Sequence, residues 1–294
     1  MTELIQTLVL SLLVGGIYAL VASGLTLIFG VMRVINIAHG AFLILGAFIT
    51  YTAWVQLGLD PLVGVAITTP VVFGLGWLVY RLFVRPIRSA PMSSTVLLTF
   101  GLALVTEGLM GFIWGNDSTS IRPSYVDESF HLGDVFLPKA QVYGGVLAVL
   151  VLVGLWLILA KTWLGRAIRA AAANPASAEL VGIKVTSVAA LVFGLGLAAA
   201  GAGGGITGVL YPFVPGSHYV WIARLLAIVV LGGLGSLEGA VLSALVFGIA
   251  ETVTAVYFSP AWATAVPYFI VFAVLLIRPQ GLLGTRLRDD AVPA

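Results

Sequence analysis

The sequence is dominated by apolar runs of about 20 residues or more, which repeat along almost the whole chain. A helix needs roughly 20 apolar residues to cross the hydrocarbon layer of a membrane. These runs are continuous, whereas the strands of a membrane barrel alternate apolar and polar residues. Hydrophobic residues make up 60% of the chain and charged residues 9%, against about a quarter charged in soluble domains. The sequence therefore predicts an all-α integral membrane protein, built as a polytopic bundle. The predicted spans are residues 4–32, 37–58, 62–80, 94–115, 141–160, 186–210, 239–258 and 263–277.

A shorter apolar run, residues 221–234, lies between two glycine-rich segments. Its length is compatible with a ninth span, a half-helix or a re-entrant element. We therefore expect eight to nine transmembrane helices, with broken or re-entrant glycine-rich segments among them.

The connecting loops carry charges of different sign, and this predicts the orientation. Lys and Arg are enriched in loops on the cytoplasmic side. With nine crossings the N-terminus lies outside, the C-terminus inside, and the acidic loop 116–140 outside. Eight crossings would require a different position for the N-terminus or a re-entrant 221–234. The basic residues that we assign to the cytoplasm are Arg81, Arg85, Arg88, Lys161, Arg166, Arg169, Lys184, Arg278, Arg286 and Arg288.

Several function classes find no support in the sequence. The longest loops have about 25 residues, too few for an independent core, so residues 1–294 are expected to form one transmembrane domain. There is no cysteine and no G-x-x-x-x-G-K-[ST] nucleotide loop. His131 and His218 are expected in or near outer loops, without the spacing of a zinc site. Leu237 interrupts the G-x-S-G pattern of intramembrane proteases at Ser236. We expect no enzyme activity, cofactor, metal or nucleic-acid partner.

Glycine pairs with G-x-x-x-G spacing favour close helix packing, because small residues let helix backbones approach each other in lipid. The dense run "VLGGLGSLEGA" (230–240) instead favours an interrupted helix. The pairs are Gly111/Gly115, Gly201/Gly205, Gly204/Gly208 and Gly235/Gly239.

Three ionisable residues, Glu107, Arg224 and Glu251, lie within apolar runs. A charge inside the membrane is costly and needs a partner, a cavity or water. Arg224 and Glu251 are expected at similar depth, where they could form an ion pair. A role in a transport pathway is the alternative for these charges, and Arg224 could also reach the lipid edge.

The stretch "RVINIAHGAF" (33–42) separates the first two apolar runs. Arg33 marks the end of the first span, and Asn36 can either cap the next helix or bond the free carbonyls at the end of the first. Gly40 permits close backbone approach, and a neutral His39 can line a cavity. Two interpretations remain open: a well-capped turn, or a gate on a translocation path. The candidate path residues are Asn36, His39, Gly40, Glu107, Arg224 and Glu251.

The loop "LGRAIRAAAANPASAELVGIK" (164–184) is longer than a simple connection requires. Its first part predicts an amphipathic helix that places Arg166 and Arg169 on one face. Pro175 should break this helix, a second helix should follow, and Gly182 should end it. Such a hairpin suits docking into a groove of a partner; an interfacial helix on anionic lipid is the alternative.

Four stretches together resemble one known family: "INIAHGAF" (35–42), "GRAIRAAAANPASAELVGI" (165–183), "VLGGLGSLEGAVLSALVFGIAE" (230–251) and "RPQGLLG" (278–284). They are similar to the LivH-type permeases of bacterial branched-chain amino-acid ABC importers. The resemblance implies an all-helical importer subunit in the bacterial cytoplasmic membrane that moves branched-chain or related amino acids by alternating access.

The resemblance also implies partners that this chain does not contain: a second, LivM-like permease, two cytoplasmic ATPase subunits and a periplasmic or lipid-anchored amino-acid-binding protein. ATP hydrolysis is expected on the ATPase subunits. An ion-coupled secondary transporter that uses Glu107 or Glu251 is the alternative from a different class. The family's loop that contacts the ATPase corresponds here to Gly165, Arg166, Arg169, Ala170, Asn174, Ala178, Leu180 and Gly182.

Overall fold

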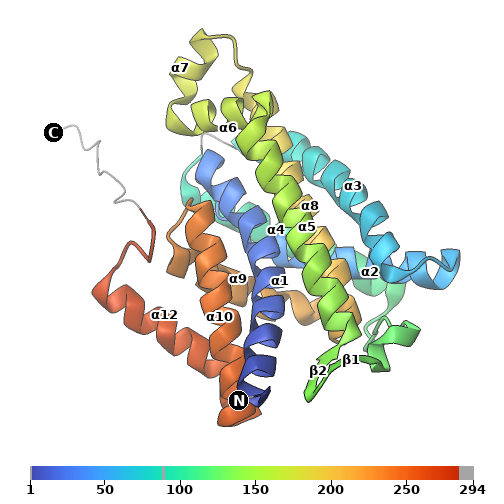
Figure 1. Cartoon of the computed structure of the whole chain (residues 1–294). Coiled ribbons are helices and arrows are strands. Elements are labelled where there is room, and N and C mark those ends of the chain that lie inside the picture. The colour runs from blue at the N-terminus through green and yellow to red at the C-terminus, as the bar shows by residue number, and fades with distance from the viewer. Residues whose placement is uncertain (1, 88–89, 285–294) are drawn as a thin grey trace.

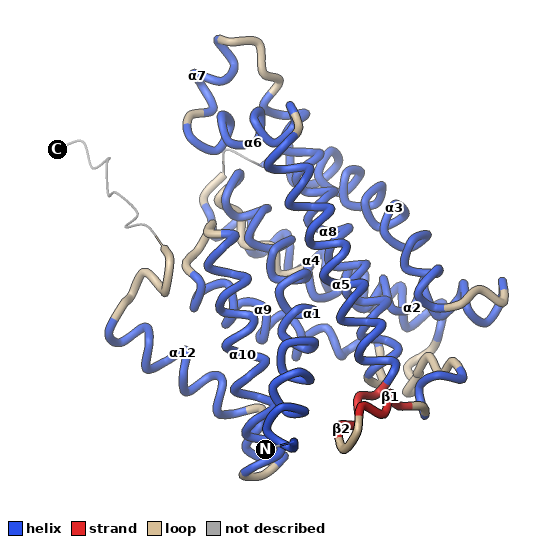
Figure 2. The backbone as a smooth tube through the Cα atoms, in the orientation of Figure 1, coloured by secondary structure: helices blue, strands red, loops and turns tan. Residues whose placement is uncertain are grey.

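The protein is described by a computed structural model that covers residues 2–87 and 90–284. Arg88, Arg286 and Arg288 lie outside these described residues. The backbone is almost entirely helical, and a two-stranded hairpin is its only sheet within the described ranges (Figure 2). Nine helices in these ranges are long and apolar enough to cross a membrane. The predicted all-α polytopic class is therefore confirmed.

The helices follow the predicted runs closely. The main elements are α1 (Thr2–Met32), α2 (His39–Leu57), α3 (Pro61–Val79), α4 (Met92–Trp114), α5 (Lys139–Lys161), α6 (Trp163–Ala173), α7 (Pro175–Leu180), α8 (Val185–Leu210), α9 (His218–Gly232), α10 (Leu237–Tyr257), α11 (Pro260–Ala263) and α12 (Ala265–Ile277). The smaller elements are the π-helical turn η1 (Tyr80–Val84), the 3-10 turns η2 (Arg85–Ile87), η3 (Ser124–Asp127) and η4 (Pro215–Ser217), and strands β1 (Ser129–Leu132) and β2 (Val135–Pro138).

The bundle has two distinct ends (Figure 1). Helices α6 and α7 stand at one end, which we call the hairpin end, while the N-terminus and the strands β1 and β2 lie at the other, the strand end. The backbone N–H of Phe136 donates to Gln6 Oε1 over 3.1 Å, which ties the strand hairpin to the start of α1. The segment around Leu283 lies beside Arg33 and Ala172 at the hairpin end.

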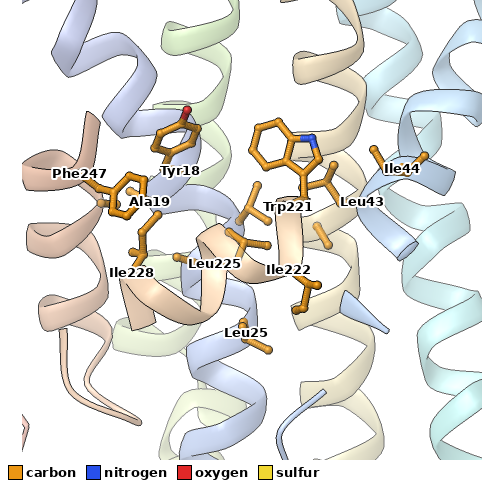
Figure 3. Packing of buried hydrophobic residues seen from close by; sticks show 14 of the residues in the cluster. Tyr18, Ala19, Leu25, Leu43, Ile44, Trp221, Ile222, Leu225, Ile228 and Phe247 are labelled. Carbon is orange, nitrogen blue, oxygen red and sulfur yellow. The ribbon is translucent and has the colours of Figure 1, made fainter. Parts of the chain in front are cut away.

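The run 221–234 forms a helix, α9, that begins at His218. Together with η4 it makes an 18-residue apolar helical stretch, Pro215–Gly232, which is long enough to count as the ninth candidate span. α9 does not run parallel to its neighbours, because it lies across α1 in the interior of the bundle (Figure 3).

Helix α8 packs through glycine against three other helices. A Cβ added at Gly204 would overlap the backbone carbonyl of Leu43 in α2, and one at Gly201 would meet Val72 of α3. On α1, a Cβ at Gly24 would overlap the carbonyl of Gly196. The close packing expected of the α8 glycines is thus confirmed, since no side chain fits between these backbones.

The pair Gly111/Gly115 packs against no other helix among the described residues of this chain, so its packing role stays a prediction. The atoms nearest to a Cβ added at Gly111 belong to Asn116 in the following loop. A Cβ added at Gly115 would have no atom within 4 Å. Gly115 instead ends α4 with a φ of 81°. This is a position that glycine tolerates far better than other residues.

The glycine-rich run 230–240 interrupts the helices, as predicted. Gly233 and Gly235 adopt φ values of 97° and 85° in the turn between α9 and α10. The Ser236 hydroxyl then caps α10 by accepting from the backbone N–H of Gly239 over 3.1 Å. The pair Gly235/Gly239 does not lie on one helix, but close approach is confirmed at both glycines: Gly235 lies against the backbone of Gly30 in α1, and Gly239 against that of Gly232 in α9.

The segment 33–38 turns back into the bundle instead of forming a surface turn. Arg33 is exposed and has a φ of 52°. Asn36 is fully buried, and His39 Nε2 donates to the carbonyl of Val21, 18 residues back, over 3.0 Å. Because Val21 lies well inside α1, helix α2 begins in the interior of the bundle.

Candidate functional site

Helix α9 lies beside a group of charged and aromatic side chains from several helices. Side chains from α1, α4 and α10 contact it, and Gly40 at the start of α2 lies against its backbone. We call this group the α9 cluster; its members are Tyr18, Glu107, His218, Tyr219, Trp221, Arg224 and Glu251. Four of the six candidate path residues, namely Gly40, Glu107, Arg224 and Glu251, are thus brought to one helix.

Arg224 and Glu251 form the expected ion pair. Arg224 Nη2 donates to Glu251 Oε1 over 2.8 Å, and the hydroxyl of Tyr18 donates to Glu251 Oε2 over 2.7 Å. The guanidinium also lies over two aromatic rings, 5.1 Å from the centre of Tyr18 and 5.2 Å from that of Trp221. Cation–π contacts of this kind stabilise a cation that has lost part of its hydration.

Glu107 has partners that the sequence did not suggest. His218 Nε2 lies 3.0 Å from Glu107 Oε2, and the Tyr219 hydroxyl donates to the same oxygen over 2.8 Å. His218 lies next to the loop 211–217, as expected, but it is the first residue of α9 and its side chain is 1% exposed. The adjacent polar pair His218–Tyr219 at the start of an apolar run was the available signal for this contact.

The α9 cluster is not sealed from its surroundings. The side chains of Glu107, Arg224 and Glu251 are 27%, 12% and 20% exposed, and Tyr219 and Val220 on α9 are exposed beside them. Arg224 Nε has no hydrogen-bond partner among the described residues. The α9 cluster thus combines a guanidinium, two carboxylates and aromatic rings at a partly exposed position.

The stretch 33–42 does not form the well-capped turn that one of the two interpretations predicts. Asn36 does not cap α2: its amide atoms contact no described hydrogen-bond partner, and Ala38 occupies the capping position without a side-chain bond. The prediction of a capping Asn36 was therefore wrong. The backbone is held by Thr99 of α4, whose hydroxyl donates to the Ile35 carbonyl over 3.1 Å and accepts from the Ile37 N–H over 3.2 Å.

Gly40 and His39 are both buried. A Cβ at Gly40 would approach the His218 carbonyl to 2.7 Å, which explains the need for glycine where α2 meets α9. The Nδ1 atom of His39 makes no hydrogen bond to a described residue. A gating role for this stretch stays a prediction.

The helical hairpin 164–184 has the predicted form. The side chain of Asn174 caps α7 by accepting from the Ser177 N–H over 3.0 Å, and Gly182, with a φ of 84°, follows its end. Arg169 Nη1 donates to the Leu159 carbonyl at the end of α5 over 2.6 Å. Leu180 and Val181 are 89% and 75% exposed at the tip.

The eight residues assigned to partner contact differ in their surroundings. Gly165 and Ala178 are buried, so they shape the hairpin, and Ala170 is half-buried. The other five are exposed: Arg166, Arg169, Asn174, Leu180 and Gly182. Val181, which was not among the candidates, belongs to the same apolar tip. No cluster of three or more potential metal ligands exists in the described part of the chain.

Comparison with known proteins gives consistent matches. The family described as "Branched-chain amino acid transport system / permease component" matches residues 7–275. The high-affinity branched-chain amino acid transport system permease protein BraD of Pseudomonas aeruginosa is 31% identical over 95% of each chain. The corresponding protein LivH of Escherichia coli is 28% identical over 92% of each chain. A probable LivH permease of Methanocaldococcus jannaschii is 27% identical over 93% of this chain and 90% of its own.

No solved structure matches the chain. The named relatives are permease proteins of transport systems, which supports the permease interpretation and not the ion-coupled alternative. Nine membrane-competent helices in the described residues agree with this assignment. The chain belongs to the permease-component family of branched-chain amino acid transport systems, and it is a multi-pass membrane protein.

Proposed function

We propose that this chain is the membrane permease subunit of an ATP-driven importer for branched-chain or related amino acids. ATP hydrolysis takes place on two separate cytoplasmic ATPase subunits, and a LivM-like second permease completes the membrane part. The hairpin end then faces the cytoplasm of the bacterium, together with the C-terminus, and the strand end faces outward with the N-terminus.

One observation carries this proposal: the α6–α7 hairpin projects from the bundle and ends in an exposed apolar tip (Figure 1). Leu180 and Val181 stand out at the tip, and Arg169 fixes the base of the hairpin to α5. An exposed apolar tip of this kind can bind in an apolar groove of a partner protein. Because the base of the hairpin is fixed to α5, a movement of the bound partner can be passed on to the transmembrane helices.

The strand end offers a surface for the substrate-binding protein. Thr119 and Phe213 pair through two backbone hydrogen bonds of 2.9 and 2.8 Å, so the loops 116–140 and 211–217 meet there. We propose that the binding protein docks on these loops and releases the amino acid toward α9. The open side of α9 then lines the path with the partner permease, and Arg224 and Glu251 exchange their mutual contact for the carboxylate and ammonium groups of the substrate.

The decisive experiment is reconstituted uptake with and without the ATPase subunits and the binding protein. We expect branched-chain amino acid uptake only in the complete system with ATP. Uptake driven by an ion gradient with this chain alone would overturn the proposal.

The hairpin itself is tested by Leu180→Glu. A charge at the apolar tip should abolish co-purification of the ATPases while leaving the fold of the exposed hairpin intact. Leu132→Glu is the matched control, because Leu132 is a similarly exposed leucine at the strand end, in β1. Equal ATPase recovery from the two variants would exclude the hairpin as the docking element.

A further inference from the structure

A cavity of about 610 Å³ lies at the hairpin end between the end of α3 and the turn that joins α7 to α8. Its lining includes three basic residues, Arg81, Arg85 and Lys184, and one acidic residue, Glu179, with Ser187 beside them. We propose that this cavity binds the phosphate of an anionic phospholipid headgroup. Gly182 is the one lining residue that also belongs to the hairpin positions assigned to ATPase contact, and the basic residues Arg81, Arg85 and Lys184 have no role assigned above.

The basic side chains of the cavity are free to meet an anion. Within the described residues, Arg85 and Lys184 take part in no ion pair. Arg81 lies 4.3 Å from the centre of the Trp77 ring, a contact that holds its guanidinium in place without neutralising its charge. With one acid against three bases, the cavity carries a net positive charge that favours a phosphate.

The position of the cavity favours a lipid over a free anion. Trp and Arg side chains are enriched where a transmembrane helix meets the headgroup layer, and Trp77 and Arg81 sit one helical turn apart near the end of α3. Leu78 and Leu82 on the same stretch are exposed, so an apolar surface for acyl chains adjoins the basic cavity. A soluble phosphate has no acyl chains and would make no contact with that apolar surface.

The volume supports the same occupant. Pockets of about 300–1,000 Å³ hold small organic ligands, and 610 Å³ is ample for a phosphoglycerol headgroup.

Each Lys or Arg near an anionic membrane surface contributes about 1 kcal/mol, which is roughly a fivefold change in affinity. Loss of two charges should therefore weaken binding roughly 25-fold.

The test uses the complete transporter complex in neutral detergent and measures retained lipid by native mass spectrometry. Phosphatidylglycerol is titrated against phosphatidylcholine for the parent complex, for Arg85→Gln/Lys184→Gln, and for the control Arg122→Gln/Lys161→Gln. The control removes two exposed basic side chains that do not line the cavity. The double variant of the cavity keeps Arg81 on Trp77, so the end of α3 is undisturbed.

We expect saturable retention of phosphatidylglycerol by the parent and the control, and weakening of roughly 25-fold in the cavity variant. Equal retention in all three complexes would overturn the proposal. Inorganic phosphate that displaces the lipid at equal concentration would show a small-anion site instead. Retention by the permease alone, lost when the ATPases are attached, would show that a protein partner covers the cavity.

Discussion

Helices α8 and α9 are both central, yet they contact their neighbours in different ways. α8 meets α1, α2 and α3 through glycine, with backbone against backbone at Gly196 and Gly204. α9 also has glycine contacts, with Gly40 of α2 and between its own Gly232 and Gly239 of α10, but it meets α1, α4 and α10 through charged, aromatic and hydroxyl side chains as well. Where two backbones touch at a glycine, the distance between the two helices is fixed. Contacts between side chains can instead be exchanged for contacts to a ligand or to a neighbouring subunit.

This contrast separates a rigid part of the bundle from an adaptable part. Packed backbones resist relative movement, because any shift of α8 creates either a clash or a gap. The ion pair and hydrogen bonds around α9 can break and re-form without moving the α8 core. We therefore expect conformational change during transport to be concentrated at α9 and its partners.

The largest expected effect tests the rigidity of α8. Gly204→Leu places its Cβ on the Leu43 carbonyl, where neither backbone can yield. Overpacking usually costs about 1–3 kcal/mol, and here we expect roughly 4 kcal/mol or failure to assemble. Gly101→Leu on α4 is the control, since a Cβ there meets nothing within 4 Å. Denaturant unfolding of the purified variants gives the comparison, and similar stability of the two would contradict a rigid α8.

The next effect concerns the ion pair of α9. Glu251→Gln leaves Arg224 without its counterion and should cost about 3 kcal/mol, because an unpaired cation stays largely buried. Arg224→Gln should cost a similar amount. The double variant should cost clearly less than the sum of the two. Additive losses in unfolding experiments would show that the two side chains do not stabilise each other.

A smaller loss is expected for Tyr18→Phe. The change removes the hydrogen bond of the hydroxyl to Glu251 while keeping the ring against Trp221. A bond to a charged group contributes about 1.5–3 kcal/mol, so we expect a loss near 1.5 kcal/mol. Tyr51→Phe is the control, since the Tyr51 hydroxyl makes no hydrogen bond to a described residue. An equal change in unfolding free energy for both would argue against the Tyr18 contact.

The substitution with the smallest expected effect on stability, Asn36→Leu, should still lower transport. Asn36→Leu replaces a buried amide without described partners by an apolar side chain of similar size. We expect the free energy of unfolding to change by less than about 1 kcal/mol, or to rise, while uptake falls. Thr99→Val should lower stability instead, because it removes bonds to Ile35 and Ile37. Normal uptake by the Asn36→Leu variant would show that the buried amide has no role in the translocation path.

The sequence predicted the features that arise from local pattern. Apolar runs of helical length predicted the spans, and Pro175 and Gly182 predicted the limits of the α6–α7 hairpin. The Arg224–Glu251 pair followed from the cost of two lone charges in neighbouring spans. The strand hairpin of residues 129–138 was missed, because its short segments lie within an acidic loop without strong alternation.

The remaining features depend on contacts between distant parts of the chain. Residues 33–38 look like a turn locally, yet Val34, Asn36 and Ala38 are buried, and Ile35 and Ile37 are bonded to Thr99 of α4, more than 60 residues away. Likewise, the partners of Glu107 are 111 and 112 residues away. Neither contact leaves a periodic signal, so a single sequence could not place His218 or the inward course of Asn36.

The inward course of residues 33–38 also sets a condition on biosynthesis. Gly40 lies against His218 and Ile222, residues that the ribosome adds almost 180 positions later. Until then, the start of α2 has no contact with α9, although Val21 of α1 and Thr99 of α4 are already available to hold residues 35–39. The amino-terminal quarter of the protein therefore reaches its final position only after most of the chain has been inserted.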